Sequence, residues 1–273
     1  MADQQQRPLP GPDLRVLPDG TDVESVSWTA PRTPSPGVMR MRWARLAYLH
    51  WPVDPALVQA RLPDGLVADV HDGAAWVGLV PFDMRDIRPP GVPPVLPWVG
   101  DFPETNVRTY VVGPDGRRGV YFHSLEASRL GAVAVARSAY ALPYCWGRMD
   151  ITTGPGRIRY RTTRRWPAPR GASSDLALRI HGRLRDDDVT ALDRFLAARW
   201  ALFVPYHGGG LARVDVAHEP WPLHRAEVEH LADDLVAAAG YGRLADGAPA
   251  HVRFSPGVQV EVGIPTRVTD AAA

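Results

Sequence analysis

The sequence predicts an α+β protein built mainly from antiparallel β-strands, as a sheet or a closed barrel, with a few short helices. Three observations lead to this class. Short apolar segments recur along the chain, turn sequences rich in Gly, Pro and Asp separate them, and strands and helices do not alternate regularly. Regular alternation would predict a parallel sheet, so its absence favours antiparallel pairing.

The first 38 residues differ in composition from the rest of the chain. They are rich in Pro, Asp, Gly, Ser and Gln, with prolines at positions 8, 10, 12, 18, 31, 34 and 36. This composition offers little apolar surface to bury and is typical of a loosely packed segment. We therefore expect a flexible leader over residues 1–38 and a single domain over residues 39–273.

Capping and turn residues set the expected element boundaries. Asp54 and Pro55 are typical of a helix start, because aspartate caps the first turn and proline fits the first helical position. Asp72-Gly73 and Gly154-Pro-Gly156 are typical of hairpin turns. The expected helices cover residues 53–63, 128–140, 190–200 and 227–239. The expected strands cover residues 42–51, 66–70, 75–82, 106–112, 119–125, 149–152, 157–163, 176–184, 211–218 and 252–264.

Composition excludes several classes of function. The 273 residues carry a formal net charge of +1, which argues against the concentrated basic face of a nucleic-acid binder. The single cysteine, Cys145, excludes an internal disulfide framework and a thiolate zinc cluster. No apolar run reaches the roughly 18–20 residues that span a bilayer, and residues 1–12 do not form a signal peptide. We therefore expect a cytoplasmic protein that binds neither nucleic acid nor membrane.

All 31 basic residues are arginine. A chain without lysine has no side-chain amine for a Schiff base, a P-loop phosphate contact or a lysine base. His218, His224 and His230 are six residues apart, which is not the spacing of a metal motif on one helix face. We expect no metal and no cofactor.

Three of these arginines, Arg157, Arg159 and Arg161, alternate along an expected strand. Alternation places them on one face of the sheet. The pattern predicts a solvated face or a ladder of ion pairs, with an anion site as the alternative.

The candidate site begins on the expected strand that contains the segment 102–110. Glu104, Asn106, Arg108 and Tyr110 share one face of this strand. If the face points inward, it brings together a carboxylate–guanidinium pair, an amide and a phenol, which can orient and protonate a polar substrate. If it points outward, it forms a surface ion pair of little consequence. The spacing alone favours neither alternative.

The next expected strand carries a second set of candidates. Tyr121, His123 and Leu125 share one of its faces, and strand pairing would bring His123 to the face of Glu104. A core histidine with satisfied hydrogen bonds is the alternative for His123.

Several segments resemble known families. Gly119–Leu125, Ala134–Arg137 and Pro143–Gly147 resemble the acetoacetate decarboxylase family. The chain from about residue 40 resembles more closely the bacterial YqjF-like family, a relative of that decarboxylase. The segments that carry this second resemblance are Phe102–Val111, Gly119–Phe122, Leu142–Tyr144 and Phe254–Val260.

The resemblance implies a decarboxylase-like fold, a homo-oligomer and a place for the site. Tyr144 and Cys145 occupy the positions of the decarboxylase's two lysines, and Glu104 falls close to its catalytic glutamate. Its substrate-binding arginine would fall near Arg42 or Arg45. Because the chain has no lysine, decarboxylation through a lysine imine is excluded.

Two main functions stay open, and we prefer the first. One is an enzyme that acts on a small oxo- or hydroxy-compound by acid–base chemistry; the other is a non-catalytic protein that binds such a molecule. A third is a partner-binding module that uses Trp98, Trp166 or Trp221. The predicted catalytic residues are Glu104, Tyr144 and His123, and the predicted substrate-binding residues are Arg108, Asn106, Arg45, Tyr121 and Cys145.

Overall fold

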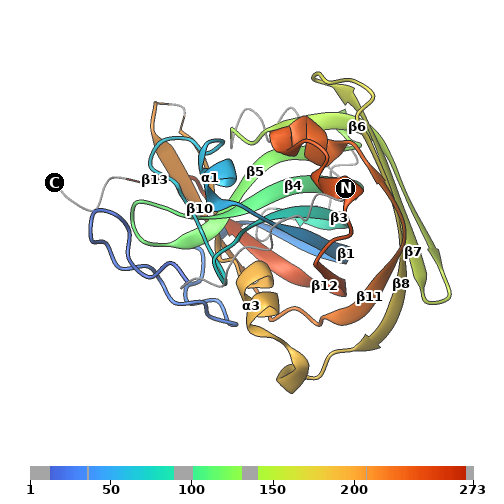
Figure 1. The fold of residues 1–273 in the computed structure, drawn as a ribbon, viewed down its shortest axis with the longest axis horizontal. Coiled ribbons are helices and arrows are strands. Elements are labelled where there is room, and N and C mark those ends of the chain that lie inside the picture. The colour runs from blue at the N-terminus through green and yellow to red at the C-terminus, as the bar shows by residue number, and fades with distance from the viewer. Residues whose placement is uncertain (1–12, 36, 89–100, 131–140, 207, 269–273) are drawn as a thin grey trace, which may run out of the picture.

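The computed structural model describes residues 13–35, 37–88, 101–130, 141–206 and 208–268 (Figure 1). In these residues the chain forms a 13-stranded sheet with a few short helical segments. The strand pairings in this part of the chain are antiparallel, except those of β5 with β6 and with β9. The predicted fold class, a mostly antiparallel sheet with few short helices, is confirmed.

The strands fall into two groups. The first group contains β1 (Gly37–Val53), β3 (Ala75–Arg88), β4 (Phe102–Val112), β5 (Arg118–Ala127), β9 (Ala201–Pro205), β10 (Leu211–His218) and β12 (His251–Gly263). The second contains β6 (Tyr144–Gly154), β7 (Arg157–Trp166), β8 (Ser173–Arg183) and β11 (His224–Asp233). Two short strands, β2 (Val67–Ala68) and β13 (Thr266–Val268), pair with β4 and β10.

The seven strands of the first group pair in a closed ring. Neighbours follow the order β1, β3, β4, β5, β9, β10 and β12, and β12 pairs with β1. Every strand of the ring contributes buried residues to one apolar cluster, which therefore lines the ring interior. One member from each strand, in ring order, is Met41, Val80, Tyr110, Val120, Val204, Val214 and Val260.

The second group of strands curves around the outside of the ring. It continues from β5 through β6, β7, β8 and β11 to β12, and forms the right-hand side of Figure 1. A second apolar cluster combines Leu176 and Leu178 of β8 with Leu49, Val77 and Val107 of the ring strands. Because side chains alternate along a strand, β1, β3, β4 and β12 each supply one face to the interior and the other face to this outer cluster.

Two α-helices lie between strands of the described chain. In α1 (Pro55–Gln59) the Asp54 carboxylate accepts a hydrogen bond from the Ala56 backbone N–H, as predicted. In α3 (Ala191–Ala197) Thr190 and Asp193 form a reciprocal capping box. Short helical turns cover Asp186–Asp188, Ala237–Tyr241 and Leu244–Asp246.

The predicted helix over residues 227–239 is wrong over residues 227–233, and only the end of the segment, from residue 235, is helical. Most of this segment belongs to β11, whose residues pair with β8. Ala226 and Val228 are half-buried while Glu227 and Glu229 are exposed or nearly so, which is the period of a strand. Pairing with β8 outweighs the local helix preference of the Ala- and Glu-rich sequence.

Other local predictions have mixed outcomes. The turn at Asp72-Gly73 is formed, with backbone hydrogen bonds in both directions between His71 and Ala74. However, β2 pairs with β4 rather than with β3, so the hairpin expected over 66–82 is wrong. Strand β9 was not predicted, and the helix expected over 128–140 lies mostly outside the described residues.

Residues 13–35, within the predicted flexible leader, make specific contacts with the rest of the domain. The buried guanidinium of Arg118 donates to the backbone oxygens of Leu14 and Glu24, each at 2.7 Å. The Trp200 indole N–H donates to the Ser27 oxygen at 2.9 Å, and Arg194 lies over the Trp28 ring. This part of the leader is therefore held against the domain.

Candidate active site

The polar face of β4 points into the ring interior. Glu104 is 2% exposed, Asn106 3%, Arg108 8% and Tyr110 0%. Strand β4 is paired on both sides, by β3 and β5, and Tyr110 belongs to the interior apolar cluster. The spacing left open whether this face points inward or outward, and in the structure it points inward.

Glu104 forms the first part of the site with a residue from another strand. The Tyr144 hydroxyl, at the start of β6, donates to Glu104 Oε2 at 2.7 Å. The parallel pairing of β6 with β5 brings Tyr144 next to Leu125, close to the strand that carries Glu104. Asn106 also interacts with the Glu104 carboxylate and lowers its pKa, while the buried Asn106 Oδ1 accepts no hydrogen bond from the described residues.

Burial dominates the titration of Glu104. It raises the pKa of this carboxyl from 4.5 to about 7, although the hydrogen bonds from Tyr144 and Asn106 act in the opposite direction. Burial and the neighbouring carboxylate also raise the pKa of Tyr144 well above its usual value, so the phenol keeps its proton. The carboxylate–guanidinium pair expected between Glu104 and Arg108 is not formed, because Arg108 turns toward Tyr110.

Arg108 begins a second part of the site, a buried chain of hydrogen bonds. Arg108 Nε and Nη2 donate to the Tyr110 hydroxyl oxygen at 3.2 and 3.1 Å. The Tyr110 hydroxyl lies 2.6 Å from His50 Nε2, and His50 Nδ1 lies 3.0 Å from His251 Nδ1. His251 Nε2 lies 2.9 Å from Asp193 Oδ1, in the cap of α3.

The charges at the two ends set the direction of this chain. Burial lowers the pKa values of His50 and His251, so both rings are neutral. Burial would raise the pKa of Asp193, but hydrogen bonds from His251 and Thr190 lower it well below its usual value. His251 therefore donates to Asp193, His50 donates to His251, and Tyr110 donates to His50. The acceptor that follows each donor in the chain therefore sets the direction in which that donor points its proton.

Aromatic rings form a wall of the interior beside Arg108. Trp43 stacks on Trp221 with ring centroids 6.2 Å apart, and Tyr48 meets Trp221 edge-on at 5.6 Å. The His218 ring lies 4.9 Å from Trp221 and 4.4 Å from Trp200. Within the described ranges of the chain, the buried indole N–H groups of Trp43 and Trp221 have no hydrogen-bond partner.

The structure places His123 and Tyr121 away from Glu104. His123 Nε2 lies 2.8 Å from the Tyr241 hydroxyl, and Tyr241 belongs to the outer apolar cluster. Burial and the nearby Arg61 lower the pKa of His123 to about 4, so the ring is neutral. Tyr121 packs on a third apolar cluster, also outside the ring. The expectation that His123 joins the Glu104 face is therefore wrong.

Arg45 and Cys145 also lie outside the Glu104 face. Arg45 donates to the Asp83 carboxylate at 2.5 Å, and its backbone oxygen accepts from Tyr160 of the outer cluster. Cys145 is buried next to Tyr144 in β6, and alternation turns it to the opposite side. The structure thus brings together Glu104, Asn106 and Tyr144, with Arg108 farther along the same face.

Several residues at the site escaped the sequence analysis. His50 and Tyr48 alternate along the predicted strand 42–51, so their shared face could have been found from spacing. His251 and Asp193 gave no such signal, because their partners lie far away in the sequence. Trp221, considered as an interface residue, is 5% exposed and packs in the interior.

Of the other two candidate interface residues, Trp166 is 43% exposed. Trp98 lies outside the described residues.

A possible metal-ligand group lies elsewhere. Among the described residues, Asp13, His71 and Asp72 bring their ligand atoms within 4.8 Å of one another. His71 Nδ1 lies 3.2 Å from the Asp13 carboxylate, and both aspartates are exposed. An ordinary histidine–carboxylate contact accounts for this arrangement, and nothing else at the position points to an ion.

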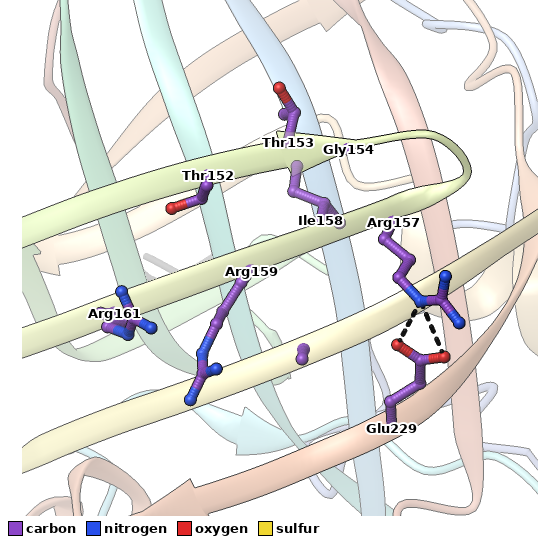
Figure 2. A pocket seen from close by; sticks show the side chains of 9 residues that line it. Thr152, Thr153, Gly154, Arg157, Ile158, Arg159, Arg161 and Glu229 are labelled. Carbon is purple, nitrogen blue, oxygen red and sulfur yellow. Dashed lines mark hydrogen bonds and ion pairs between the residues drawn. The ribbon is translucent and has the colours of Figure 1, made fainter.

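The alternating arginines of β7 line a hollow of about 450 Å³ on the outside of the second strand group (Figure 2). Arg157 pairs with Glu229 at 2.9 Å, and Arg159 donates two hydrogen bonds of 2.7 Å to Asp175. Arg161 lies 3.6 Å from Asp175. The predicted ladder of ion pairs is confirmed.

The comparisons identify the family of this chain. The model of the DUF2071 family, described as "Uncharacterized conserved protein", matches residues 40–259. The protein YqjF of Bacillus subtilis is 33% identical over 203 residues, which cover 74% of this chain and 82% of that protein. The chain has a sheet-rich, mostly antiparallel fold, and it belongs to the DUF2071 family. No helix in the described residues is both long and apolar enough to cross a membrane.

Solved structures with the same fold include enzymes. Acetoacetate decarboxylase from Legionella pneumophila is 15% identical, with a TM-score of 0.58 and 94% of both chains covered. An acetoacetate decarboxylase-like enzyme from Sphingomonas wittichii is 15% identical, with a TM-score of 0.60, covering 86% of this chain and 94% of that one. The enduracididine biosynthesis enzyme MppR, complexed with pyruvate, is 16% identical, with a TM-score of 0.55, covering 97% of this chain and 100% of that one.

Proposed function

We propose that this protein is an enzyme that moves protons on a small oxo- or hydroxy-compound, with Glu104 as the acid–base group. The observation that carries the proposal is the buried hydrogen bond of 2.7 Å from Tyr144 to Glu104. A carboxyl with a pKa of about 7 populates both protonation states near neutral pH, which is the condition for general acid–base catalysis.

The proposed step uses both side chains. The Glu104 carboxylate takes a proton from a carbon next to a carbonyl group, and the electron pair of the C–H bond moves to the carbonyl oxygen. Tyr144, whose phenol keeps its proton, turns its O–H from Glu104 to this oxygen and stabilises the developing charge. Glu104 then returns the proton to the same carbon or to another one. No lysine imine takes part.

The names of the structural neighbours support a small oxo-compound as the substrate. One neighbour is an acetoacetate decarboxylase, and another was solved with pyruvate. The predicted catalytic role of His123 and the binding roles of Tyr121, Arg45 and Cys145 are not part of the proposal, because these residues lie off the Glu104 face. The homo-oligomer and the cytoplasmic location stay predictions.

A non-catalytic binding protein is the second candidate. It is favoured by the residues at the positions of the decarboxylase's lysines, which are Tyr144 and Cys145 here. Such a protein would bind its ligand in the same interior and release it chemically unchanged.

A thermal-shift screen followed by a turnover assay tests the proposal. Wild type, Glu104→Gln and the exposed control Glu219→Gln are screened against small oxo acids, β-diketones and aryl carboxylates. A compound at a hundredfold over its Kd stabilises the protein by about 2.7 kcal/mol, which is a shift of several degrees. We expect turnover of a stabilising compound by wild type and by Glu219→Gln, and none by Glu104→Gln. Unchanged turnover in Glu104→Gln would contradict the proposal.

A further inference from the structure

Arg108 differs from the other buried arginines of the described chain in having no acidic partner. Three further arginines are less than 9% exposed, and each forms an ion pair: Arg118 and Arg199 with Asp69, and Arg164 with Glu126. Among the described residues, no carboxylate pairs with Arg108. A buried charge without a counter-charge is costly, so proteins rarely keep one without a use.

The groups that surround Arg108 do not compensate its charge. Its guanidinium lies over the rings of Tyr48 and Tyr110, 5.5 and 5.4 Å from their centroids. Burial raises the pKa values of both phenols and lowers those of His50 and His218, so all four side chains are neutral at pH 7. The face-on contacts stabilise the cation in part, but they supply no formal negative charge.

The hydrogen bonds of Arg108 leave one nitrogen for a ligand. Nε and Nη2 donate to the Tyr110 hydroxyl, and Nη2 also donates to the Leu196 backbone oxygen at 3.3 Å. The guanidinium also interacts with the Tyr48 side chain, but within the described chain no acceptor lies at hydrogen-bond distance and geometry from Nη1, so its N–H groups are available. The chain from Tyr110 through His50 and His251 to Asp193 holds the guanidinium in place. The position is therefore fixed before any ligand binds.

Glu104 and Arg108 are far enough apart to set the length of the ligand. They lie four residues apart on one strand, which places their Cα atoms about 13 Å from each other. After allowance for a contact at each end, the ligand must span about 7–10 Å. Between them lies Asn106, whose unpartnered Oδ1 can accept a hydrogen bond, next to the apolar side chains of Val80 and Leu125.

We propose that the substrate is an extended organic carboxylate whose anionic group binds Arg108 Nη1 while its oxo- or hydroxy-bearing end lies at Glu104 and Tyr144. The inference rests on the proposed function for the reacting end only. An apolar spacer, aliphatic or aromatic, connects the two ends along the wall of Tyr48 and Trp221. Pyruvate is too short to reach both groups.

Isothermal titration calorimetry with three ligands tests the inference. The ligands are 7-oxooctanoate, its neutral methyl ester and pyruvate. We expect 7-oxooctanoate to bind wild type at least about tenfold more tightly than the ester or pyruvate, because only the long acid presents a carboxylate to Arg108 and reaches Glu104. This comparison needs no variant, so it holds even if an Arg108 variant fails to fold.

Variants then locate the anionic contact. Arg108→Gln should weaken the binding of 7-oxooctanoate at least about tenfold and leave the binding of the ester unchanged. The surface variant Arg161→Gln should bind like wild type. Equal binding of acid and ester, unchanged affinity in a folded Arg108→Gln variant, or no binding of 7-oxooctanoate would overturn the inference.

The inference and the proposed function fail in different ways. If 7-oxooctanoate binds through Arg108 but wild type never changes it or exchanges its protons, the anion site stands and the proposed catalysis fails. If wild type turns over an oxo-compound with a rate that Arg108→Gln leaves unchanged, the catalysis stands and the anion site fails. Glu104→Gln, which keeps Arg108, should bind the acid normally in either case.

Discussion

Replacing Glu104 by glutamine should change the stability of the protein relative to wild type, and the change should favour the variant more at neutral pH than at acidic pH. Glu104 is 2% exposed, and burial raises the pKa of its carboxyl from 4.5 to about 7. The folded protein therefore holds the proton more tightly than the unfolded chain does. The stability that this proton contributes is fully present below pH 4.5 and is lost as the pH rises through about 7.

The size of the effect follows from the width of this pH window. The interval from 4.5 to about 7, at about 1.4 kcal/mol for each pH unit, corresponds to about 3 kcal/mol in the free energy of unfolding. Glutamine is neutral at every pH and nearly isosteric, so the variant lacks this loss. Its advantage over wild type should grow by about 3 kcal/mol from the low to the high end of the window.

Urea unfolding of both proteins at several pH values between 4.5 and 8.5 measures the difference. Other titrating groups, such as Asp233, whose pKa burial raises to about 6, contribute equally to both proteins and cancel. The exposed variant Glu219→Gln serves as the control and should follow wild type. A constant difference between wild type and Glu104→Gln across the range would refute the raised pKa and, with it, the burial of a titrating carboxyl.

Three further substitutions test other buried groups. In Tyr144→Phe the hydrogen bond that lowers the pKa of Glu104 is removed, so the window should move to higher pH; an unmoved midpoint in the same unfolding series would contradict this contact. Arg164→Gln should lower the free energy of unfolding by about 3–5 kcal/mol, because it leaves the buried Glu126 without its cation. Arg108→Gln should lower the free energy of unfolding much less, since no acid is left unpaired. If chemical unfolding ranks the two variants the other way, the charge of Arg108 is compensated by the protein itself.

Local sequence signals predicted much of the fold. The cap at Asp54 and the turn at Asp72-Gly73 formed as expected, because their geometry depends on neighbouring residues only. The helix predicted over residues 227–239 is wrong over residues 227–233, because the strand there depends on pairing with β8, more than 40 residues earlier in the chain. Local helix preference does not contain that information.

The candidate site also combines features that depend on local sequence with features that depend on distant strand pairing. The inward face of Glu104, Asn106 and Arg108 follows from the period of a strand once its neighbours are known. The position of His123 does not, because a bulge in the pairing of β4 with β5 leaves His123 unpaired and reverses the face of Tyr121. A single extra residue exchanges the two faces, and no local sequence pattern marks its position.

The residues that hold Arg108 lie beyond any local pattern. His50 and His251 are 201 positions apart, and they meet because β1 and β12 are neighbours in the ring. Asp193 reaches them from the cap of α3, where its first role is local. A hydrogen-bond network assembled from three distant segments becomes visible only when the strand order is known.

The most direct test of the acid–base centre at Glu104 is proton exchange on carbon. Oxo-compounds that stabilise the protein are incubated with it in D₂O, and NMR follows the replacement of hydrogen by deuterium next to the carbonyl group. The readout needs no knowledge of the product. We predict exchange with wild type and none above background with Glu104→Gln. A compound that binds in the interior and is released from wild type without deuterium would contradict catalysis and leave a binding protein.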